Sequence, residues 1–367
     1  MRRLPPLLLG LGLTLTACGG SAGDAPASPG GSSSEVTTAA PQTLNPDRPP
    51  KVVDEVATGL EVPWGLDFLP DGTAVVTERD SGRVLTIRDG SVTEVGRIDE
   101  AVPEGEAGLL GVAVSPDFAD DSRLFLYVTT GEDNRIVRTT LDDGVLGAVE
   151  PILTGIPNGF IHDGGRLAFG PDDLLYASTG EIGEVQLAQD RRSLGGKILR
   201  ITPDGDPAPD NPDPESPIFT LGHRNVQGLA FDGGGQLWAS EFGSQEFDEL
   251  NRIDAGNNYG WPQFEGSGGS GQFTDPQVVW RTSEASPSGL AFLDGELWMA
   301  SLRGQRLWRV SVKGDRAVRP RDFFVGEYGR LRTVAVAPDG NLWVTTSNRD
   351  GRGDPADADD RILVIRP

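Results

Sequence analysis

The sequence predicts an all-β protein, a six-bladed β-propeller preceded by a signal peptide and a disordered tether. A strand–turn–strand pattern recurs six times, and most of its turns combine Pro, Asp and Gly between runs of apolar and β-branched residues. The six repeats start at Gly65, Gly111, Arg166, Gly228, Gly289 and Thr333. Units of three or four short strands at intervals of roughly 45–60 residues are typical of propellers.

The first element, residues 1–18, resembles an export signal. Arg2 and Arg3 precede an apolar run from Leu4 to Leu15, which is too short to span a bilayer as a permanent helix. The run ends in Leu15-Thr16-Ala17-Cys18, a sequence that resembles a bacterial lipobox, in which the cysteine is lipidated. The alternative is an ordinary secretory signal with a chance cysteine. Cys18 is the only cysteine, so it forms no internal disulfide.

The second element, residues 19–50, is dominated by Gly, Ser, Ala, Pro and Thr and has too little apolar content to fold. We therefore expect a flexible tether that holds the remaining chain away from a membrane. Together the two segments predict an extracytoplasmic protein, attached to the bacterial cell membrane by a lipid anchor alone.

The third element is the propeller, residues 51–367, whose six blades leave no room for a second domain. We expect a strand after each turn, at residues 73–77, 124–129, 174–178, 236–240, 296–300 and 341–345. A third strand follows at 83–87, 197–201, 306–310 and 361–365. We expect the first strand, 52–57, to pair with the last blade and close the ring, which protects sheet edges. A β-sandwich would not explain the repeated turn.

The charge balance narrows the partners. The chain has 32 basic and 55 acidic residues and a net charge of −23. This argues against nucleic acid or anionic lipid as a partner. It is compatible with divalent cations, which bind carboxylate and carbonyl oxygens.

The chain has only two histidines, His162 and His223, and both lie in turns that open a repeat. Each could simply hydrogen-bond its turn, or could do chemistry. His162 has a possible partner in Glu181, which ends the strand that follows its turn. A carboxylate there could fix the imidazole tautomer, as in many general bases. Two histidines and one cysteine make a transition-metal site improbable.

Arginines are placed unusually in the loops: Arg224, Arg303, Arg330 and Arg332. Arg330 and Arg332 alternate on an extended segment, so their side chains point the same way and can grip one ligand. Guanidinium groups suit planar carboxylates. From composition alone, the arginines indicate either an anionic ligand or neutralisation of nearby Asp and Glu.

Six segments carry a resemblance to a known family. They are GLLGVAVSPDF (108–118), HDGGRLAFG (162–170), SLGGKILRITPDG (193–205), LGHRNVQGLAF (221–231), DELNRIDAGNNYGWP (248–262) and SPSGLAF (286–292). Together they resemble the soluble quinoprotein sugar dehydrogenases, the glucose and aldose dehydrogenases that depend on pyrroloquinoline quinone (PQQ). They cover nearly the whole propeller in family order.

The resemblance implies oxidation of the anomeric carbon of aldose sugars to lactones, with PQQ and Ca²⁺ as cofactors. His162 would be the general base during hydride transfer to C5 of PQQ, Glu181 its orienting carboxylate, and Arg224 the stabiliser of negative charge on the quinone. The remaining implied sites follow the family order. Cofactor binding falls to Glu106, Asn225, Arg303, Arg330 and Arg332, the cofactor calcium to carbonyls of Gly243 and Ser244, a second calcium to Glu249 and Tyr259, and the sugar to Gln186 and Leu187.

The chain departs from the glucose enzymes at several of these positions. Glu106 stands where they carry glutamine, Ile161 replaces an aspartate, Arg303 replaces a lysine and Ser244 a proline. The sequence is therefore more similar to the broader aldose group. Sugar, electron acceptor and a monomeric or homodimeric state stay open. Two other functions are possible: a non-catalytic extracellular ligand-binding propeller, or a calcium-dependent lactonase-like hydrolase with acidic ligands converging on the channel.

Overall fold

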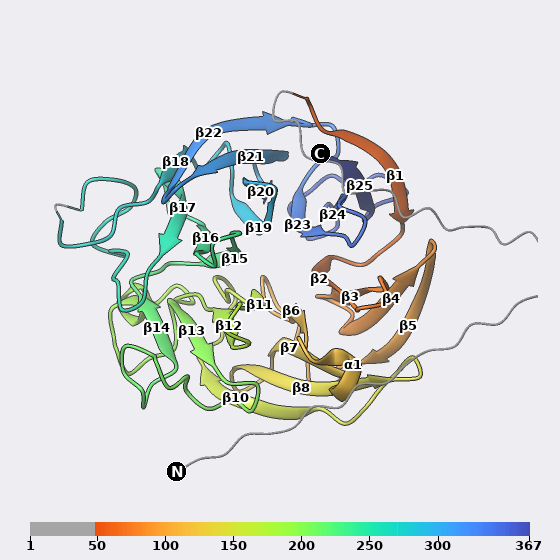
Figure 1. Cartoon of the computed structure of the whole chain (residues 1–367), viewed down its shortest axis with the longest axis horizontal. Coiled ribbons are helices and arrows are strands. Elements are labelled where there is room, and N and C mark those ends of the chain that lie inside the picture. The colour runs from red at the N-terminus through yellow and green to blue at the C-terminus, as the bar shows by residue number, and fades with distance from the viewer. Residues whose placement is uncertain (1–47, 270) are drawn as a thin grey trace, which may run out of the picture. The chain divides into compact units, whose positions relative to one another are not determined.

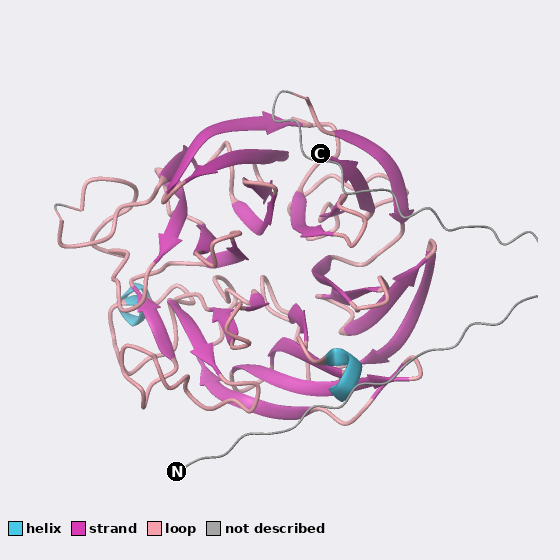
Figure 2. Ribbon diagram, viewed as in Figure 1, coloured by secondary structure: helices cyan, strands magenta, loops and turns pink. Residues whose placement is uncertain are grey.

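Six antiparallel sheets form a ring around a central channel in the computed structural model, which describes residues 48–269 and 271–367 (Figures 1 and 2). The predicted signal, Cys18 and nearly all of the predicted tether lie outside the described residues. Across the described part of the chain, no helix is long and apolar enough to cross a membrane. The predicted all-β, six-bladed propeller is confirmed.

The blades follow the chain in order, each with its innermost strand first except where noted. Blade 1 contains β2 (Pro63–Phe68), β3 (Ala74–Glu78), β4 (Arg83–Arg88) and β5 (Ser91–Arg97). Blade 2 contains β6 (Leu109–Val114), β7 (Arg123–Thr129), β8 (Asn134–Asp142) and β10 (Glu150–Ile156), with β9 (Val145–Leu146) beside β8 and the short helix α1 (Phe118–Asp121) before β7. Blade 3 contains β11 (Leu167–Phe169), β12 (Leu175–Ser178), β13 (Lys197–Ile201) and β14 (Ile218–Leu221).

Blade 4 contains β15 (Val226–Phe231), β16 (Leu237–Glu241), β17 (Phe247–Ile253) and β18 (Val278–Arg281). Blade 5 contains β19 (Pro287–Leu293), β20 (Glu296–Ser301), β21 (Arg306–Lys313) and β22 (Arg316–Phe323). Blade 6 contains β23 (Leu331–Val336), β24 (Leu342–Thr346), β25 (Ile362–Arg366) and, outermost, β1 (Lys51–Ala57). The six strands predicted after the turns are confirmed with their ends shifted by no more than one residue.

The ring closes in the predicted way. β1 pairs antiparallel with β25, with Lys51 opposite Arg366 and Ala57 opposite Ile362. The N-terminal strand therefore completes the blade that the C-terminus ends, and the two segments lie side by side at one place on the ring (Figure 1). Pairing the edge of the last blade in this way leaves no unsatisfied backbone there.

The hydrophobic core lies between neighbouring blades. Successive side chains of a strand point to opposite faces of its sheet, and here both faces are covered. In β3, Val75 packs toward blade 2, whereas Ala74 and Val76 pack toward blade 6. In β16, Trp238 packs toward blade 5, and Leu237 and Ala239 pack toward blade 3. This arrangement fixes the radial positions of the innermost strands and so fixes the loops that enter them.

Candidate functional site

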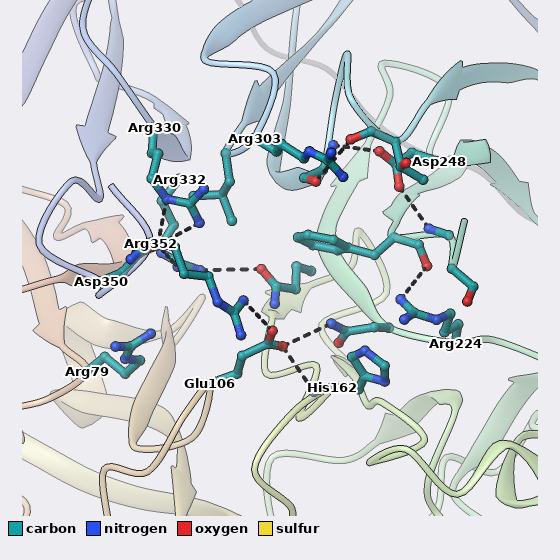
Figure 3. A pocket seen from close by; sticks show the side chains of 18 residues that line it. Arg79, Glu106, His162, Arg224, Asp248, Arg303, Arg330, Arg332, Asp350 and Arg352 are labelled. Atoms are coloured by element: carbon teal, nitrogen blue, oxygen red, sulfur yellow. Dashed lines mark hydrogen bonds and ion pairs between the residues drawn. The ribbon is translucent and has the colours of Figure 1, made fainter. Parts of the chain in front are cut away.

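A cavity of about 390 Å³ lies among the loops that enter the innermost strands, and all six blades contribute to it (Figure 3). Its lining is rich in charge. Six arginines line it, namely Arg79, Arg224, Arg303, Arg330, Arg332 and Arg352, with three carboxylates, Glu106, Asp248 and Asp350. The cavity is therefore cationic in a chain whose net charge is −23. We call it the arginine cavity.

His162 lies in the wall of this cavity and is paired with Glu181. Its Nδ1 lies 2.7 Å from Glu181 Oε1, and Glu181 is almost completely buried. An ionised Glu181 accepts the proton of Nδ1, which leaves the Nε2 lone pair available. Within the described chain, Nε2 has no hydrogen-bond partner. The predicted His162–Glu181 contact is therefore present, and the imidazole has the form of a base.

The backbone around His162 is shaped to hold the ring there. His162 adopts a positive φ of 61°, which is uncommon for a residue with a side chain. Gly180 packs directly against the carbonyl of His162, and a Cβ at Gly180 would collide with that oxygen. Glycine at 180 thus lets the strand end that carries Glu181 approach the His162 turn.

Glu106 joins this turn to the opposite side of the cavity. Its carboxylate accepts the backbone N–H of His162 at 3.0 Å and an N–H of Arg352 at 2.7 Å. Burial alone would raise the pKa of Glu106, but the bonds from Arg352 and from the His162 backbone outweigh it and hold that pKa below its usual value. Glu106 is therefore a carboxylate at neutral pH, and Arg352 is the counter-charge beside it in Figure 3.

Arg330 and Arg332 converge as their alternation on the sequence predicts, and they share one carboxylate. Arg330 donates two hydrogen bonds to Asp350 Oδ2, at 2.9 and 2.8 Å, and Arg332 donates one at 3.3 Å. Burial lowers the pKa of Arg332 to about 10, so it stays a cation at neutral pH. Asp350 thus neutralises one of two buried guanidinium groups, and the pair retains excess positive charge.

Arg224 and Asn225 complete the wall beside His162. Burial lowers the pKa of the Arg224 guanidinium, whose Nη1 donates to the carbonyl of Phe242 at 3.4 Å. The Asn225 side chain accepts the N–H of Gly164 at 3.1 Å and donates to Glu106 at 3.4 Å. Arg303 also lines the cavity, from the loop after β20, and its side chain is exposed.

The segment predicted to bind the cofactor calcium also reaches the cavity. Gly243 and Ser244 line it together with Asp248, which accepts the N–H groups of Gly243 and Ser286 at 2.9 and 2.6 Å. Burial raises the pKa of Asp248 to about 6. On the other side of the loop, Glu265 accepts four consecutive backbone N–H groups, from residues 244 to 247.

The two residues predicted for a second calcium lie next to the arginine cavity, in a smaller pocket that shares Arg224 and Gly243 with it. Burial and the neighbouring Glu241 raise the pKa of Glu249 to about 8. Asn251 donates to both carboxylates, and its own Oδ1 has no partner. The Tyr259 hydroxyl is already engaged, because it donates to the Arg252 carbonyl and accepts the Asp254 N–H.

The residues predicted to contact sugar are not in the cavity lining. Gln186 and Leu187 lie on a short 3-10 helix, Val185–Ala188, in the loop after Glu181. Sequence reasoning also missed four lining residues, Arg79, Gln227, Asp350 and Arg352. Only Arg352 carried a signal, since it lies between two glycines in a loop near the end of the last blade. Within the described ranges, no three His, Cys, Asp or Glu side chains converge to hold a metal ion.

Comparison with known proteins gives one consistent family. The model of the glucose/sorbosone dehydrogenase family matches residues 60–363. The structure of the PQQ-bound aldose sugar dehydrogenase of Streptomyces coelicolor is 53% identical, with a TM-score of 0.85, covering 89% of this chain and 99% of that one. A Thermus thermophilus protein described as a putative oxidoreductase (glucose dehydrogenase) is 44% identical, with a TM-score of 0.81, covering 87% and 100%. The aldose sugar dehydrogenase YliI of Escherichia coli is 29% identical, covering 85% and 92%.

Proposed function

The chain belongs to the glucose/sorbosone dehydrogenase family, and from this premise we propose that it is a PQQ- and calcium-dependent aldose dehydrogenase. It oxidises the anomeric carbon of an aldose to the lactone. The observation that carries this proposal is the pairing of His162 with Glu181 in the wall of the arginine cavity. There a base with an unoccupied Nε2 faces a set of guanidinium groups.

The residues of the cavity fit PQQ. PQQ is a planar tricarboxylate, and six arginines against three carboxylates leave a surplus of positive charge for it to balance. Arg330, Arg332 and Arg303 would hold its carboxylates. When bound, PQQ supplies the acceptor for the hydride that leaves the anomeric carbon. The fit is chemical, because charge-assisted bonds between guanidinium and carboxylate are stronger than neutral ones.

The protein groups then have distinct tasks. His162 Nε2 accepts the proton of the anomeric hydroxyl, so that the C–O bond can become a carbonyl. Glu181 holds the ring in the required tautomer and stabilises the imidazolium that results. Arg224 presents a buried positive charge from the neighbouring blade, which favours a negative charge that develops nearby. Glu106 and Asn225 hold the His162 turn through its backbone.

The oxygen-rich loops fit calcium at two places. Backbone carbonyls of Gly243 and Ser244 would hold the ion beside PQQ. Glu249 is the acidic residue for the second ion, where two buried carboxylates and the unpartnered Asn251 Oδ1 lie close together. Tyr259 would contribute its backbone carbonyl, since its hydroxyl is engaged. A divalent cation there would relieve the repulsion between Glu241 and Glu249.

The two alternatives have less support. A calcium-dependent hydrolase needs acidic ligands that converge from several blades, whereas Glu106 and Asp350 in the cavity are each bonded to an arginine. A non-catalytic binding propeller gives no reason for a buried His–Glu pair that leaves Nε2 unsatisfied beside the cavity. Neither alternative accounts for both features.

Titration of the chelator-treated protein with PQQ and calcium tests the proposal. We expect PQQ to bind stoichiometrically, with a change in its absorbance, and an aldose then to reduce a dye. Calcium should raise the melting temperature before PQQ is added, since ligand binding to the native state adds ~3 kcal/mol at a hundredfold excess over Kd. No PQQ binding in the presence of calcium would reject the proposal, and a melting temperature indifferent to calcium would reject both calcium sites.

We also propose that residues 1–18 direct export, that 19–50 act as a tether and that Cys18 carries the lipid anchor of an extracytoplasmic protein. The test is the membrane fraction of cells that express Cys18→Ala. Loss of the acyl mass and release of the protein from the membrane are expected. Retention with an unchanged acyl mass would contradict the assignment.

A further inference from the structure

A single arginine crosses the central channel below the arginine cavity. Four repeats begin with glycine, whereas the third begins with Arg166 and the sixth, on the opposite side of the ring, with Thr333. Arg166 Nη2 donates to Thr333 Oγ1 at 3.1 Å, and its Nε donates to the Gln227 carbonyl at 2.8 Å. Its guanidinium also lies 4.2 Å from the centroid of the Trp64 ring. Glycine elsewhere in this layer leaves the space that the arginine occupies.

Arg166 lacks the counter-charge that other buried arginines have. Arg330 and Arg332 pair with Asp350, and Arg200 pairs with Asp172. No carboxylate of the described chain forms an ion pair with Arg166, although its exposure is only 7%. Burial and the neighbouring Arg332 lower its pKa to about 9, so it remains a cation at neutral pH. A buried cation without a counter-charge is costly.

Its third nitrogen has no hydrogen bond within the described chain, and Arg166 lines a second cavity of about 280 Å³. We call this the channel cavity. It shares no lining residue with the arginine cavity and lies further along the same innermost strands. Apolar side chains dominate its walls, among them Leu66, Val112, Leu167, Leu229, Leu290 and Val334.

One carboxylate, Asp67, also lines the channel cavity, but it is bonded elsewhere. Its two oxygens accept the backbone N–H groups of Phe68 and Val114, each at 2.8 Å. Burial raises the pKa of Asp67 to about 6 despite these bonds. Asp67 therefore does not neutralise Arg166, and it reduces the room for a ligand with more than one negative charge.

We propose that the channel cavity binds a small organic monocarboxylate, with its carboxylate on the unpartnered nitrogen of Arg166 and its apolar chain along the strand side chains. The guanidinium supplies the charge complement, and the walls favour an apolar body over an inorganic anion, which would lose its water there without replacement. The volume is at the lower end for ligand pockets, which limits the occupant to a short chain. This site is separate from the proposed dehydrogenase site and does not depend on it.

The test uses hexanoate as the probe and 1-hexanol as its uncharged counterpart, titrated calorimetrically into the purified protein. We expect saturable 1:1 binding of hexanoate and binding at least tenfold weaker for hexanol, because one charge-assisted bond is missing. Arg330→Ala should bind hexanoate as wild type does, since that arginine lines the other cavity. Arg166→Met, which keeps much of the volume, should bind it at least tenfold more weakly.

A second variant covers the case in which Arg166→Met does not fold. Ala335→Leu narrows the channel cavity from a partly exposed position on β23 and leaves Arg166 in place. It should abolish hexanoate binding while the melting temperature stays close to that of wild type. The proposal is overturned by equal binding of hexanol, by unchanged binding in Ala335→Leu, by loss of binding in Arg330→Ala, or by no saturable binding.

Discussion

Blades 3 and 4 contain the same histidine–glutamate pair at the same place, and the two pairs have different surroundings. In blade 3, His162 Nδ1 lies 2.7 Å from Glu181; in blade 4, His223 Nδ1 lies 2.8 Å from Glu241. Each histidine is in the turn before an innermost strand, and each glutamate lies at or just after the end of the second strand. The repeat therefore builds this pair twice.

The difference lies in the second ring nitrogen. His223 Nε2 is bonded to Thr220 at 2.9 Å, its ring stacks on Tyr259 at 4.6 Å, and it is completely buried. His162 instead lines the arginine cavity and leaves Nε2 without a protein partner in the described structure. A buried His–Glu pair is thus structural where both nitrogens are satisfied, and available for proton transfer where one faces a cavity.

The largest expected effect follows from this difference. His162→Ala should lower kcat for aldose oxidation by a factor of ~10²–10⁴, because a general base contributes about that much. PQQ should still bind, since His162 acts on the sugar hydroxyl. The measurements are steady-state turnover at saturating PQQ and equilibrium binding of PQQ. A variant with more than about a tenth of wild-type turnover would make His162 structural, like His223.

The second prediction concerns the charge that surrounds only the blade 3 pair. Arg332→Ala should weaken PQQ binding by roughly tenfold to a hundredfold, as expected for one charge-assisted contact of ~1.5–3 kcal/mol. Asp350 keeps its two bonds from Arg330 in this variant, so the loop retains an anchor. Fluorescence titration with PQQ measures the effect. Unchanged affinity would mean that the arginine cavity takes another ligand.

The third prediction sharpens the structural half of the comparison. His223→Gln should leave kcat within about twofold of wild type and should lower stability, because removal of one partner of a buried pair costs about 3–5 kcal/mol. Glu241 would then be left beside Glu249 with less compensation. Thermal unfolding and turnover measured on one preparation check both parts. A large loss of turnover in folded protein would show that His223 also serves the reaction.

The sequence predicts much of this arrangement, but not all of it. The turn motif predicts the blades, and the alternation of Arg330 and Arg332 predicts their convergence on one point, because strand periodicity determines both. The position of Arg352 could not be predicted, since it meets Glu106 across the ring, 246 residues away in sequence. Likewise, the sequence shows two equivalent histidines and does not reveal that Thr220 satisfies only one of them.

The smallest expected effect concerns Arg352, which has no equivalent beside the His223 pair. In the folded protein the pKa of Glu106 is below its ordinary value, so its ionised form adds stability above that ordinary value, and this contribution is lost as the pH falls through the lowered pKa. Arg352→Gln removes the bond at 2.7 Å, so Glu106 should protonate at a higher pH. The acid limb of the kcat/KM profile should therefore move toward neutrality.

The shift should be modest, because the Arg352 side chain is half-exposed and water screens its charge. Glu106→Gln is the matched control, since it keeps a polar acceptor for the His162 N–H and removes the titrating group. In the background of Glu106→Gln, Arg352→Gln should leave the acid limb where it is. If Arg352→Gln gives the wild-type profile when Glu106 is present, Arg352 does not control the charge of Glu106. A shift that persists without Glu106 would instead place the effect on another titrating group of the cavity, of which Asp248, with its pKa raised by burial to about 6, is the candidate.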